Sequence, residues 1–384
     1  MSSLRAADRR SHARVLAIAA AAALATAGPV ATAGPTAALA NPAALVQPRA
    51  PTPSAPVAQC TVRDDRLAEL SGLAADAEFR YATSDGGRRL QVIVLRKDCT
   101  VQRVITAAVD PFDIEDLALG SDGRLWLADI GDNDRRRETV ALHVLAPTGA
   151  PTLHRLTYPD GPHDAEALLM DRNGTPYLVT KETLGDSGVY RPVGPMATPG
   201  PTPLELVTRV RLGRTDTPGG PVGPIGSTLV TGGASSADGS VVALRTYTDA
   251  YLFAVPDGDL VAALGRQPVR VPLPNEPQGE AIAFEPYGAL LSASERRDAG
   301  PQPIRAVPGA AALVTASNSA SNPASNAEPS SGTPNPAPPG SAPSAQPAGT
   351  SQPGRGPLAD WHAVLIAVLG AAAVIIVIRR VVRR

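Results

Sequence analysis

The stretch Glu115-Asp-Leu-Ala-Leu-Gly-Ser-Asp-Gly-Arg-Leu-Trp-Leu-Ala-Asp129 has the pattern of two short strands joined by a glycine turn. Apolar residues alternate with others on both sides of Ser121-Asp-Gly123, which is typical of a half-buried hairpin. Glycine allows the positive φ that a tight hairpin turn needs. The stretch therefore predicts an antiparallel pair of strands over residues 115–129, ending on an aspartate.

The opening phrase of this stretch recurs along the chain, as Glu69-Leu-Ser-Gly-Leu-Ala, Glu166-Ala-Leu-Leu-Met and Glu280-Ala-Ile-Ala-Phe. A weaker copy at 232–246 keeps the glycine turn but has Ala234-Ser235 where the glutamate phrase would stand. Self-similarity of this kind marks a repeat fold.

Each predicted hairpin is followed by another apolar stretch and a return strand. The apolar stretches are 91–95, 140–145 and 251–255, and the returns are 101–104, 152–156 and 204–212. Four strands at a spacing of about 45 to 50 residues are typical of one β-propeller blade. We therefore predict an all-β propeller with five blades; a sixth, with an eroded strand in 214–229, is the alternative. A β-sandwich would not require the phrase to recur.

The N-terminus predicts export. Four arginines up to Arg14 precede an uncharged apolar run from Val15 to Ala27, and small residues follow, with cleavage predicted after Ala33 or Ala40. This is the pattern of a secretory signal peptide over 1–40. The pair Arg9-Arg10 makes a twin-arginine signal the alternative to general secretion.

The C-terminus predicts a membrane anchor. Residues 361–378 carry no charge, and about 20 apolar residues suffice to cross a bilayer as a helix, so we predict a transmembrane helix over 358–378. Four arginines in 379–384 follow, which predicts a cytoplasmic basic tail and an extracytoplasmic domain on a single-pass protein at the cell membrane.

Between these ends the composition divides the chain. Residues 41–59 are a leader rich in Pro and Ala, and 311–357 are rich in Ser, Pro, Asn and Ala, which predicts a disordered stalk. The propeller is predicted over 60–310. Formal net charge is −1, and the two ends carry a surplus of arginine, so the part outside the membrane is acidic. This argues against nucleic acid as a partner.

The two cysteines of the chain, Cys60 and Cys99, lie in the exported part, where disulfides persist. We expect them to pair, with two buried free thiols as the alternative.

Charged residues recur where channel-lining strands and their neighbours would meet. Three interpretations compete. The first is a Ca²⁺ site, because Ca²⁺ prefers several oxygen ligands. Its candidate ligands are Glu115, Asp116, Asp129, Asp132 and Asn133. The second is a ring of salt bridges with no reaction. The third is acid–base hydrolysis, for which the candidate catalytic residues are Glu166, Lys181, Arg245 and Glu280.

Further charged residues are predicted at the channel mouth: Asp85, Asp164, Glu182 and Glu295. His163 lies three residues before Glu166, but an offset of three places two side chains on opposite faces of a strand, so we interpret it as a turn residue. Asp129-Ile-Gly-Asp-Asn133 is either a cation loop or an Asx-rich turn. Phosphate-binding glycine loops, Cys/His metal spacings and serine nucleophile elbows do not occur in the sequence.

The segments Phe112–Ala118, Asp129–Asn133, His163–Ala167, Arg245–Tyr247 and Gln278–Ala281 resemble secreted bacterial β-propellers of the esterase-like or phytase-like group, related to regucalcin and strictosidine synthase. The resemblance covers about residues 60–308. It implies the propeller fold, and its phytase-like members imply calcium at acidic channel residues. Ala234-Ser235 and Lys181 depart from a fully acidic ring.

These observations predict a membrane-anchored extracytoplasmic propeller that binds a small molecule or a protein partner at an acidic channel mouth, with a divalent cation such as Ca²⁺ as a candidate structural ion. The alternative is a metal-assisted hydrolase of phosphate or carboxylic esters. Propellers host many functions, so the fold does not choose between them.

Overall fold

The structure is a computed structural model that describes residues 52–146, 151–297 and 300–314. The predicted signal peptide, most of the leader, most of the stalk, the transmembrane helix and the basic tail lie outside these residues. Of the helices in the described part, none is both long and apolar enough to cross a membrane.

The described residues form four sheets. In hydrogen-bonding order, one sheet consists of β1 (Val57–Val62), β20 (Gln302–Val307), β19 (Leu290–Ser294) and β18 (Gly279–Phe284). A second consists of β2 (Leu70–Ala75), β3 (Arg80–Ser84), β4 (Leu90–Leu95) and β5 (Val101–Ala107), and a third of β14 (Val230–Ser235), β15 (Val241–Thr246), β16 (Asp249–Ala254) and β17 (Val269–Pro272). The fourth sheet has eight strands.

The eight-stranded sheet joins two antiparallel groups of four through a short parallel pairing of β13 with β9. One group is β6 (Ile114–Leu119), β7 (Leu125–Asp129), β8 (Val140–Leu145) and β9 (Thr152–Thr157); the other is β10 (Ala165–Met170), β11 (Pro176–Thr180), β12 (Asp186–Pro192) and β13 (Thr202–Arg211). Short helices are η1 (Asp65–Leu67), η2 (Gly223–Ser227) and α1 (Leu260–Leu264).

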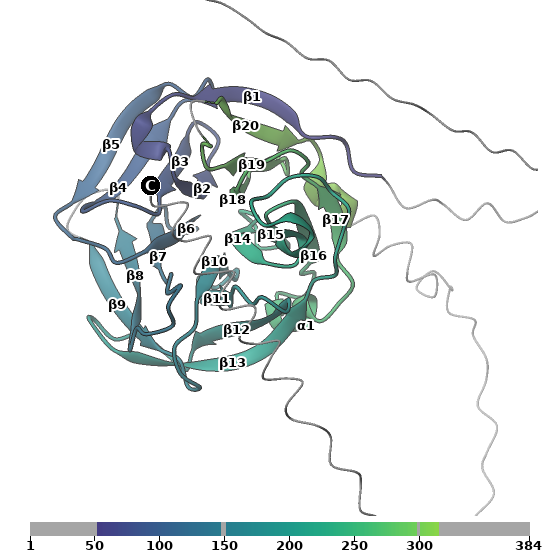
Figure 1. The fold of residues 1–384 in the computed structure, drawn as a ribbon. Helices are drawn as coiled ribbons and strands as arrows, with labels where there is room; N and C mark the ends of the chain where they lie inside the picture. Colours follow the sequence, from purple (N-terminus) through teal and green to yellow (C-terminus); the bar gives the residue numbers. More distant parts are fainter. Residues whose placement is uncertain (1–51, 147–150, 298–299, 315–384) are drawn as a thin grey trace, which may run out of the picture. The chain divides into compact units, whose positions relative to one another are not determined.

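The first strand of each group of four lies on the inside of a ring (Figure 1). Strands β2, β6, β10, β14 and β18 each contact the next, and β18 contacts β2. The sheets therefore surround a common axis, which is the arrangement of a β-propeller. Apolar clusters between neighbouring sheets hold the ring together; one combines Val92 with Leu117 and Leu127.

The ring is closed by pairing the two ends of the described chain. Strand β1 is antiparallel to β20, with Val57 opposite Ala306 and Val62 opposite Gln302. The fold therefore begins at Val57, three residues before the predicted boundary. It also extends past residue 310, because Val314 is buried in the adjacent core.

The predicted hairpins are confirmed. Strand β6 pairs with β7 and β10 with β11, around turns in which Gly123 and Gly174 have φ of 78° and 82°. Residues with a Cβ rarely adopt such angles, so the turns need glycine. Segment 214–229, where a sixth blade was the alternative, is described throughout and contains η2 but no strand.

Cys60 and Cys99 form a disulfide between β1 and the turn that joins β4 to β5. It therefore links the sheet that closes the ring to the next sheet. We expect the Cys60→Ser/Cys99→Ser double variant to unfold with a free energy lower by roughly 3 kcal/mol, because the loop it opens gains entropy when the chain unfolds. Urea denaturation of both proteins measures the difference. Superimposable curves would show that the bridge does not stabilise the fold.

Candidate functional site: the acidic channel mouth

All five inner strands carry a β-bulge at the same level. The pairing register shifts between residues 70 and 72, 114 and 116, 165 and 167, 230 and 232, and 279 and 282. The residues inside these bulges are Ser71, Glu115, Glu166, Thr231 and, in β18, Glu280 with Ala281. A bulge re-aims a side chain without ending the strand. The recurring glutamates thus occupy equivalent positions.

Two of the five positions carry a hydroxyl group, and both hydroxyls donate to the neighbouring inner strand. Ser71 Oγ lies 3.0 Å from the carbonyl oxygen of Ile114, and Thr231 Oγ1 lies 2.8 Å from that of Gly279. Ser71 is therefore the structural counterpart of Glu115. Glu69 lies two residues earlier, so the sequence repeat aligned there was out of register. Likewise, Thr231 rather than Ala234-Ser235 takes the glutamate position in β14.

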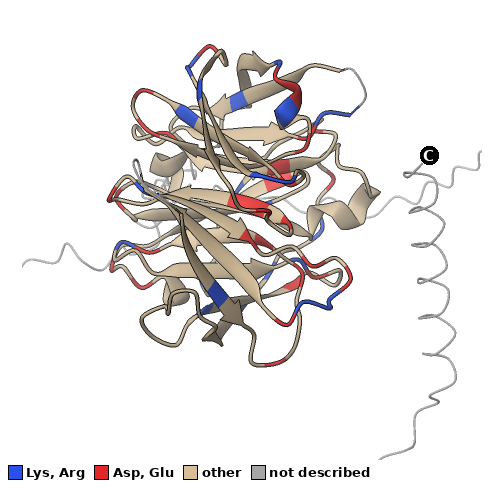
Figure 2. Ribbon diagram, turned by 90° about the vertical axis from the view of Figure 1, so that its left-hand side faces the viewer, with Lys and Arg blue, Asp and Glu red and all other residues tan. Residues whose placement is uncertain are grey.

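The three glutamates act electrostatically on one another and on further carboxyl groups. Figure 2 shows Asp and Glu segments on strands inside the domain. We define the acidic channel mouth by Asp85, Asp113, Glu115, Asp164, Glu166, Lys181, Glu280 and Glu295, whose charges act on one another. Each of them lies at the start of an inner strand or the end of its neighbour.

Lys181 supplies the one positive charge of this set. Its Nζ lies 2.5 Å from Glu166 Oε1 and 5.3 Å from the centre of the Tyr247 ring. Burial acts to lower the pKa of Lys181, but the carboxylates of Glu166, Glu280 and Glu115 outweigh it and hold that pKa well above its usual value. Lys181 therefore stays charged and balances part of the negative charge.

Glu115 is left without a partner. Its residue is 5% exposed, and among the described residues its carboxylate has no hydrogen-bond partner. Burial, followed by the charges of Glu166, Asp113 and Glu280, raises its pKa well above the usual range. An ionised carboxylate is rarely buried without a partner. The charge of Lys181 acts to lower the pKa of Glu115 but does not outweigh burial and the neighbouring carboxylates, so Glu115 is short of positive charge.

Burial also raises the pKa values of neighbouring carboxyl groups. Gln278 Nε2 donates to Glu280 Oε1 at 3.2 Å, and burial with the charge of Glu295 raises the pKa of Glu280 well above its usual value. Burial raises the pKa of Glu295 to about 7. Asp85 has a buried oxygen with no partner among the described residues. Burial and the charges of Glu69 and Glu280 raise its pKa to about 8.

The five predicted calcium ligands are not brought together. Both oxygens of Asp116 accept backbone N–H groups, from Leu117, Leu168 and Gly233. Asp116 therefore connects β6 to β10 and β14 by hydrogen bonds.

Asp129 and Asp132 belong to the loop after β7. The carboxylate of Asp129 accepts hydrogen bonds from the backbone N–H groups of Phe112 and Asp113. Its oxygens also lie 2.8 Å from Arg137 Nη2 and 3.1 Å from His143 Nε2. Burial opposes ionisation, but the bonds from His143 and Arg137 lower its pKa to about 2. Asp132 accepts from the backbone of Arg137.

Asn133, the fifth predicted ligand, is exposed. Within the ranges that the structure describes, no group of three or more His, Cys, Asp or Glu side chains is placed to hold a metal ion. The carboxylates of the loop 129–133 accept from the backbone of Phe112, Asp113 and Arg137, which lie outside the loop. Glu115 alone of the five faces the channel group.

Three of the four predicted catalytic residues, Glu166, Lys181 and Glu280, do come together. Arg245 does not join them. Its side chain is fully buried, with Nη2 2.6 Å from Glu276 and Nη1 within hydrogen-bond distance of the carbonyl oxygens of Ala281 and Ala293. Arg245 thus ties β15 to the next sheet, which is a structural role.

Of the predicted mouth residues, Asp164 directly precedes β10 and Glu182 follows the end of β11. Asp164 accepts from the backbone of Asp132, and Glu182 pairs with Arg135 at 2.8 Å. His163, interpreted as a turn residue, contacts Asp160 and the Tyr190 hydroxyl at 3.0 and 3.1 Å. Its Nδ1 lies 3.6 Å from Glu182 Oε1, and no contact of the described residues joins it to Glu115, Glu166 or Glu280.

Sequence reasoning missed Asp113 and Tyr247. Burial and the charge of Asp164 raise the pKa of Asp113 to about 6. A signal was present, because Asp113 and Glu115 are two residues apart on one strand edge and so share a side. Tyr247 has no such signal, since it lies in a connection far along the chain.

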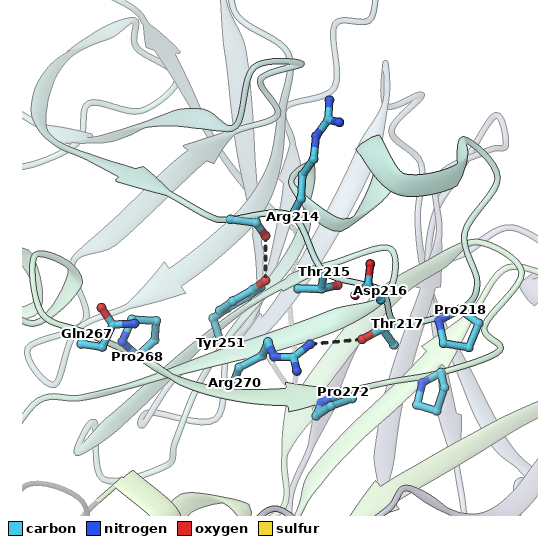
Figure 3. A pocket seen from close by; sticks show the side chains of 12 residues that line it. Arg214, Thr215, Asp216, Thr217, Pro218, Tyr251, Gln267, Pro268, Arg270 and Pro272 are labelled. Carbon is cyan, nitrogen blue, oxygen red and sulfur yellow. Dashed lines mark hydrogen bonds between the residues drawn. The ribbon is translucent and has the colours of Figure 1, made fainter. Parts of the chain in front are cut away.

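A separate cavity of about 760 Å³ lies beside β17 (Figure 3). Its wall includes Tyr251 and Arg270; Arg270 Nη1 lies 3.2 Å from Thr217 Oγ1, while Arg214 extends away from these residues. Asp249, fully buried behind them, is neutralised by Arg270 at 2.9 Å. None of the channel carboxyl groups lines this cavity, and of its charged residues Arg270 is paired, with Asp249.

A β-propeller with an acidic channel mouth is the class that this fold and site define. No protein-family model and no curated protein matches the chain.

Solved structures resemble it in part. One is a gluconolactonase from Xanthomonas campestris, 14% identical, covering 67% of this chain and 99% of that chain with a TM-score of 0.38. Others are a PQQ-bound aldose sugar dehydrogenase from Streptomyces coelicolor (10% identical, 68% of this chain and 99% of that chain, TM-score 0.37) and a virginiamycin B lyase from Staphylococcus aureus (11%, 61% and 66%, 0.34). Such distant likenesses assign no activity to this chain. The phytase-like or esterase-like resemblance stays a prediction.

Proposed function

We propose that this chain is a five-bladed extracytoplasmic β-propeller, anchored through residues 358–378, that binds a cationic ligand at the acidic channel mouth. The unpartnered carboxylate of Glu115 is the observation that carries the proposal. The disulfide between Cys60 and Cys99 supports an oxidising location outside the cytoplasm.

Charge explains why the ligand is cationic. The mouth combines seven carboxyl groups with the single ammonium of Lys181, and burial raises the pKa of Glu166 to about 8. Without a ligand, part of these groups hold protons, because neighbouring buried carboxylates repel each other. A bound cation replaces those protons. Its affinity therefore increases as the pH rises.

Two kinds of cation fit this chemistry. Ca²⁺ is the predicted structural ion and binds carboxylate oxygens, but among the described residues no three acidic side chains are placed to hold it. An ammonium or guanidinium group can donate hydrogen bonds to carboxylates that lie too far apart to bind one metal ion. Lys181 already places an ammonium group beside Glu166 in the acidic channel mouth. The spacing of the described carboxylates favours the organic cation.

Calorimetric titration of the purified chain tests the proposal, with Ca²⁺ and ethylguanidinium as separate probes. We expect at least one to bind, and the Glu115→Gln variant to lose about tenfold in affinity, which is about 1.4 kcal/mol. Glu205→Gln is the control, because that glutamate forms an exposed ion pair with Arg191 on β12. The proposal would be refuted if neither probe binds above pH 7, or if the Glu115→Gln variant binds with the same affinity as the unchanged protein.

One observation favours the alternative, a metal-assisted hydrolase of phosphate or carboxylic esters. A carboxyl group with the raised pKa of Glu166, 2.5 Å from Lys181, has the properties of a general acid beside an electrostatic stabiliser. Calcium-dependent turnover of nitrophenyl esters or phosphates that is lost in Glu166→Gln would support it. No turnover with retained cation binding would leave the binding function alone.

A further inference from the structure

The loops around the acidic channel mouth can be identified from the strand register. Ile114 at the start of β6 pairs with Asp129 at the end of β7, so inner strands start where their neighbours end. The connections β5–β6, β11–β12 and β13–β14 therefore lie at the acidic end. The connections β12–β13 and β18–β19 lie at the opposite end.

Each of the three connections at the acidic end exposes a large apolar side chain. Phe112, Leu184 and Val222 are 72%, 90% and 43% exposed. Their neighbours in the chain belong to the site or touch it. Phe112 precedes Asp113, Leu184 follows Lys181 by three residues, and Val222 precedes η2, whose Gly226 is hydrogen-bonded to the backbone of Tyr247.

The ring of Phe112 also has a cation on it. The guanidinium carbon of Arg137 lies 4.4 Å from the ring centre, and Arg137 is held in place by Asp129 at 2.8 Å. The exposed aromatic is thus fixed on one face while its other face is free. A rigid aromatic side chain loses little entropy when a partner covers it, which is typical of binding hot spots.

Lys181 shows how a cation enters the mouth. It reaches Glu166 by a four-carbon stem, and its ammonium lies against the Tyr247 ring. A lysine or arginine from outside can make the same approach to Glu115, whose carboxylate lacks a partner in the described chain.

We infer that this face docks a protein partner that inserts a lysine or arginine side chain into the channel mouth and covers Phe112, Leu184 and Val222 with apolar residues. The inference rests on the proposed cation binding, and it identifies the cation as a basic side chain of a protein partner. Complementary charge directs the encounter, and a central charged anchor surrounded by apolar contacts is the usual composition of a binding hot spot.

Exposed apolar residues at the other end serve as controls. Val193 and Tyr287 are 60% and 89% exposed, but no unpartnered buried carboxylate lies among their neighbours in the described chain. Single exposed apolar residues are common on protein surfaces. The acidic end differs because its apolar residues adjoin a site that combines seven carboxyl groups with the single ammonium of Lys181.

Selection of random displayed peptides on the purified full chain tests the inference. We expect the enriched peptides to share a lysine or arginine flanked by apolar residues. For the best synthetic peptide, fluorescence anisotropy should show about tenfold weaker binding when that basic residue is replaced by glutamine, and about as much with Glu115→Gln. Leu184→Ser and Phe112→Ser should each weaken it severalfold, while Tyr287→Ser should not.

Leu184 is almost fully exposed, so its replacement cannot unfold the domain, and thermal denaturation verifies this for each variant. Peptides without a shared basic residue, or affinity that does not respond to Leu184→Ser and Phe112→Ser, would overturn the inference. If ethylguanidinium binds as tightly as the peptide, the apolar residues of the peptide contribute nothing. The cation site would then be supported and the docking surface refuted. If light scattering shows that the chain self-associates and Leu184→Ser makes it monomeric, the occupant is a second copy instead.

Discussion

Replacing Arg245 by alanine is expected to lower the free energy of unfolding by about 3 to 5 kcal/mol. The guanidinium and the Glu276 carboxylate are 2.6 Å apart, with side chains 0% and 1% exposed. Removing the arginine leaves Glu276 buried with Ser292 at 2.7 Å and a distant Arg305 at 3.9 Å. It also leaves the carbonyl oxygens of Ala281 and Ala293 without this donor.

Urea denaturation followed by circular dichroism measures this loss, and Arg191→Ala is its matched control. Arg191 pairs with Glu205 at 2.8 Å, but the two side chains are 40% and 44% exposed. Exposed pairs contribute up to about 1 kcal/mol, so the control should change stability little. If the two variants lose equally little, Arg245 does not join the sheets as its contacts indicate.

The strands were predictable because their signals are local. Alternation and glycine turns identify β6–β7 and β10–β11 within about fifteen residues of sequence each. The pairing of β1 with β20 carries no such signal, since it joins residues more than two hundred positions apart in the chain. Only the need to close the ring requires it. The boundary at Val57 was missed for that reason.

The candidate site was predicted where the sequence repeats and missed where identical residue types have different partners. Glu115, Glu166 and Glu280 recur in one phrase, and the structure gathers them. Asp116 and Asp129 belong to the same acidic stretch, but backbone N–H groups and Arg137 engage their oxygens. Whether a carboxylate is free or engaged depends on contacts from other strands, which a sequence pattern does not encode.

Without a ligand, the thermal midpoint of the chain is expected to fall by at least about 10 °C between pH 5 and pH 8. Asp85, Glu166 and Glu295 have pKa values raised to about 8, 8 and 7 by burial and like charge. In the unfolded chain these carboxyls titrate near pH 4. Their contribution to stability is therefore complete below that pH and is lost as the pH rises through the folded values.

The Asp85→Asn and Glu295→Gln variants should flatten this pH dependence, because an amide at these sites does not ionise. A saturating cationic probe should restore the midpoint at pH 8 and have little effect at pH 5, where protons already neutralise the mouth. Both effects follow from ligand binding to the folded state alone. A midpoint that rises from pH 5 to pH 8, or a probe that stabilises equally at both, would mean that the carboxyl groups are ionised without a ligand. The mouth would then have no shortage of positive charge, and Glu115 would not identify a binding site.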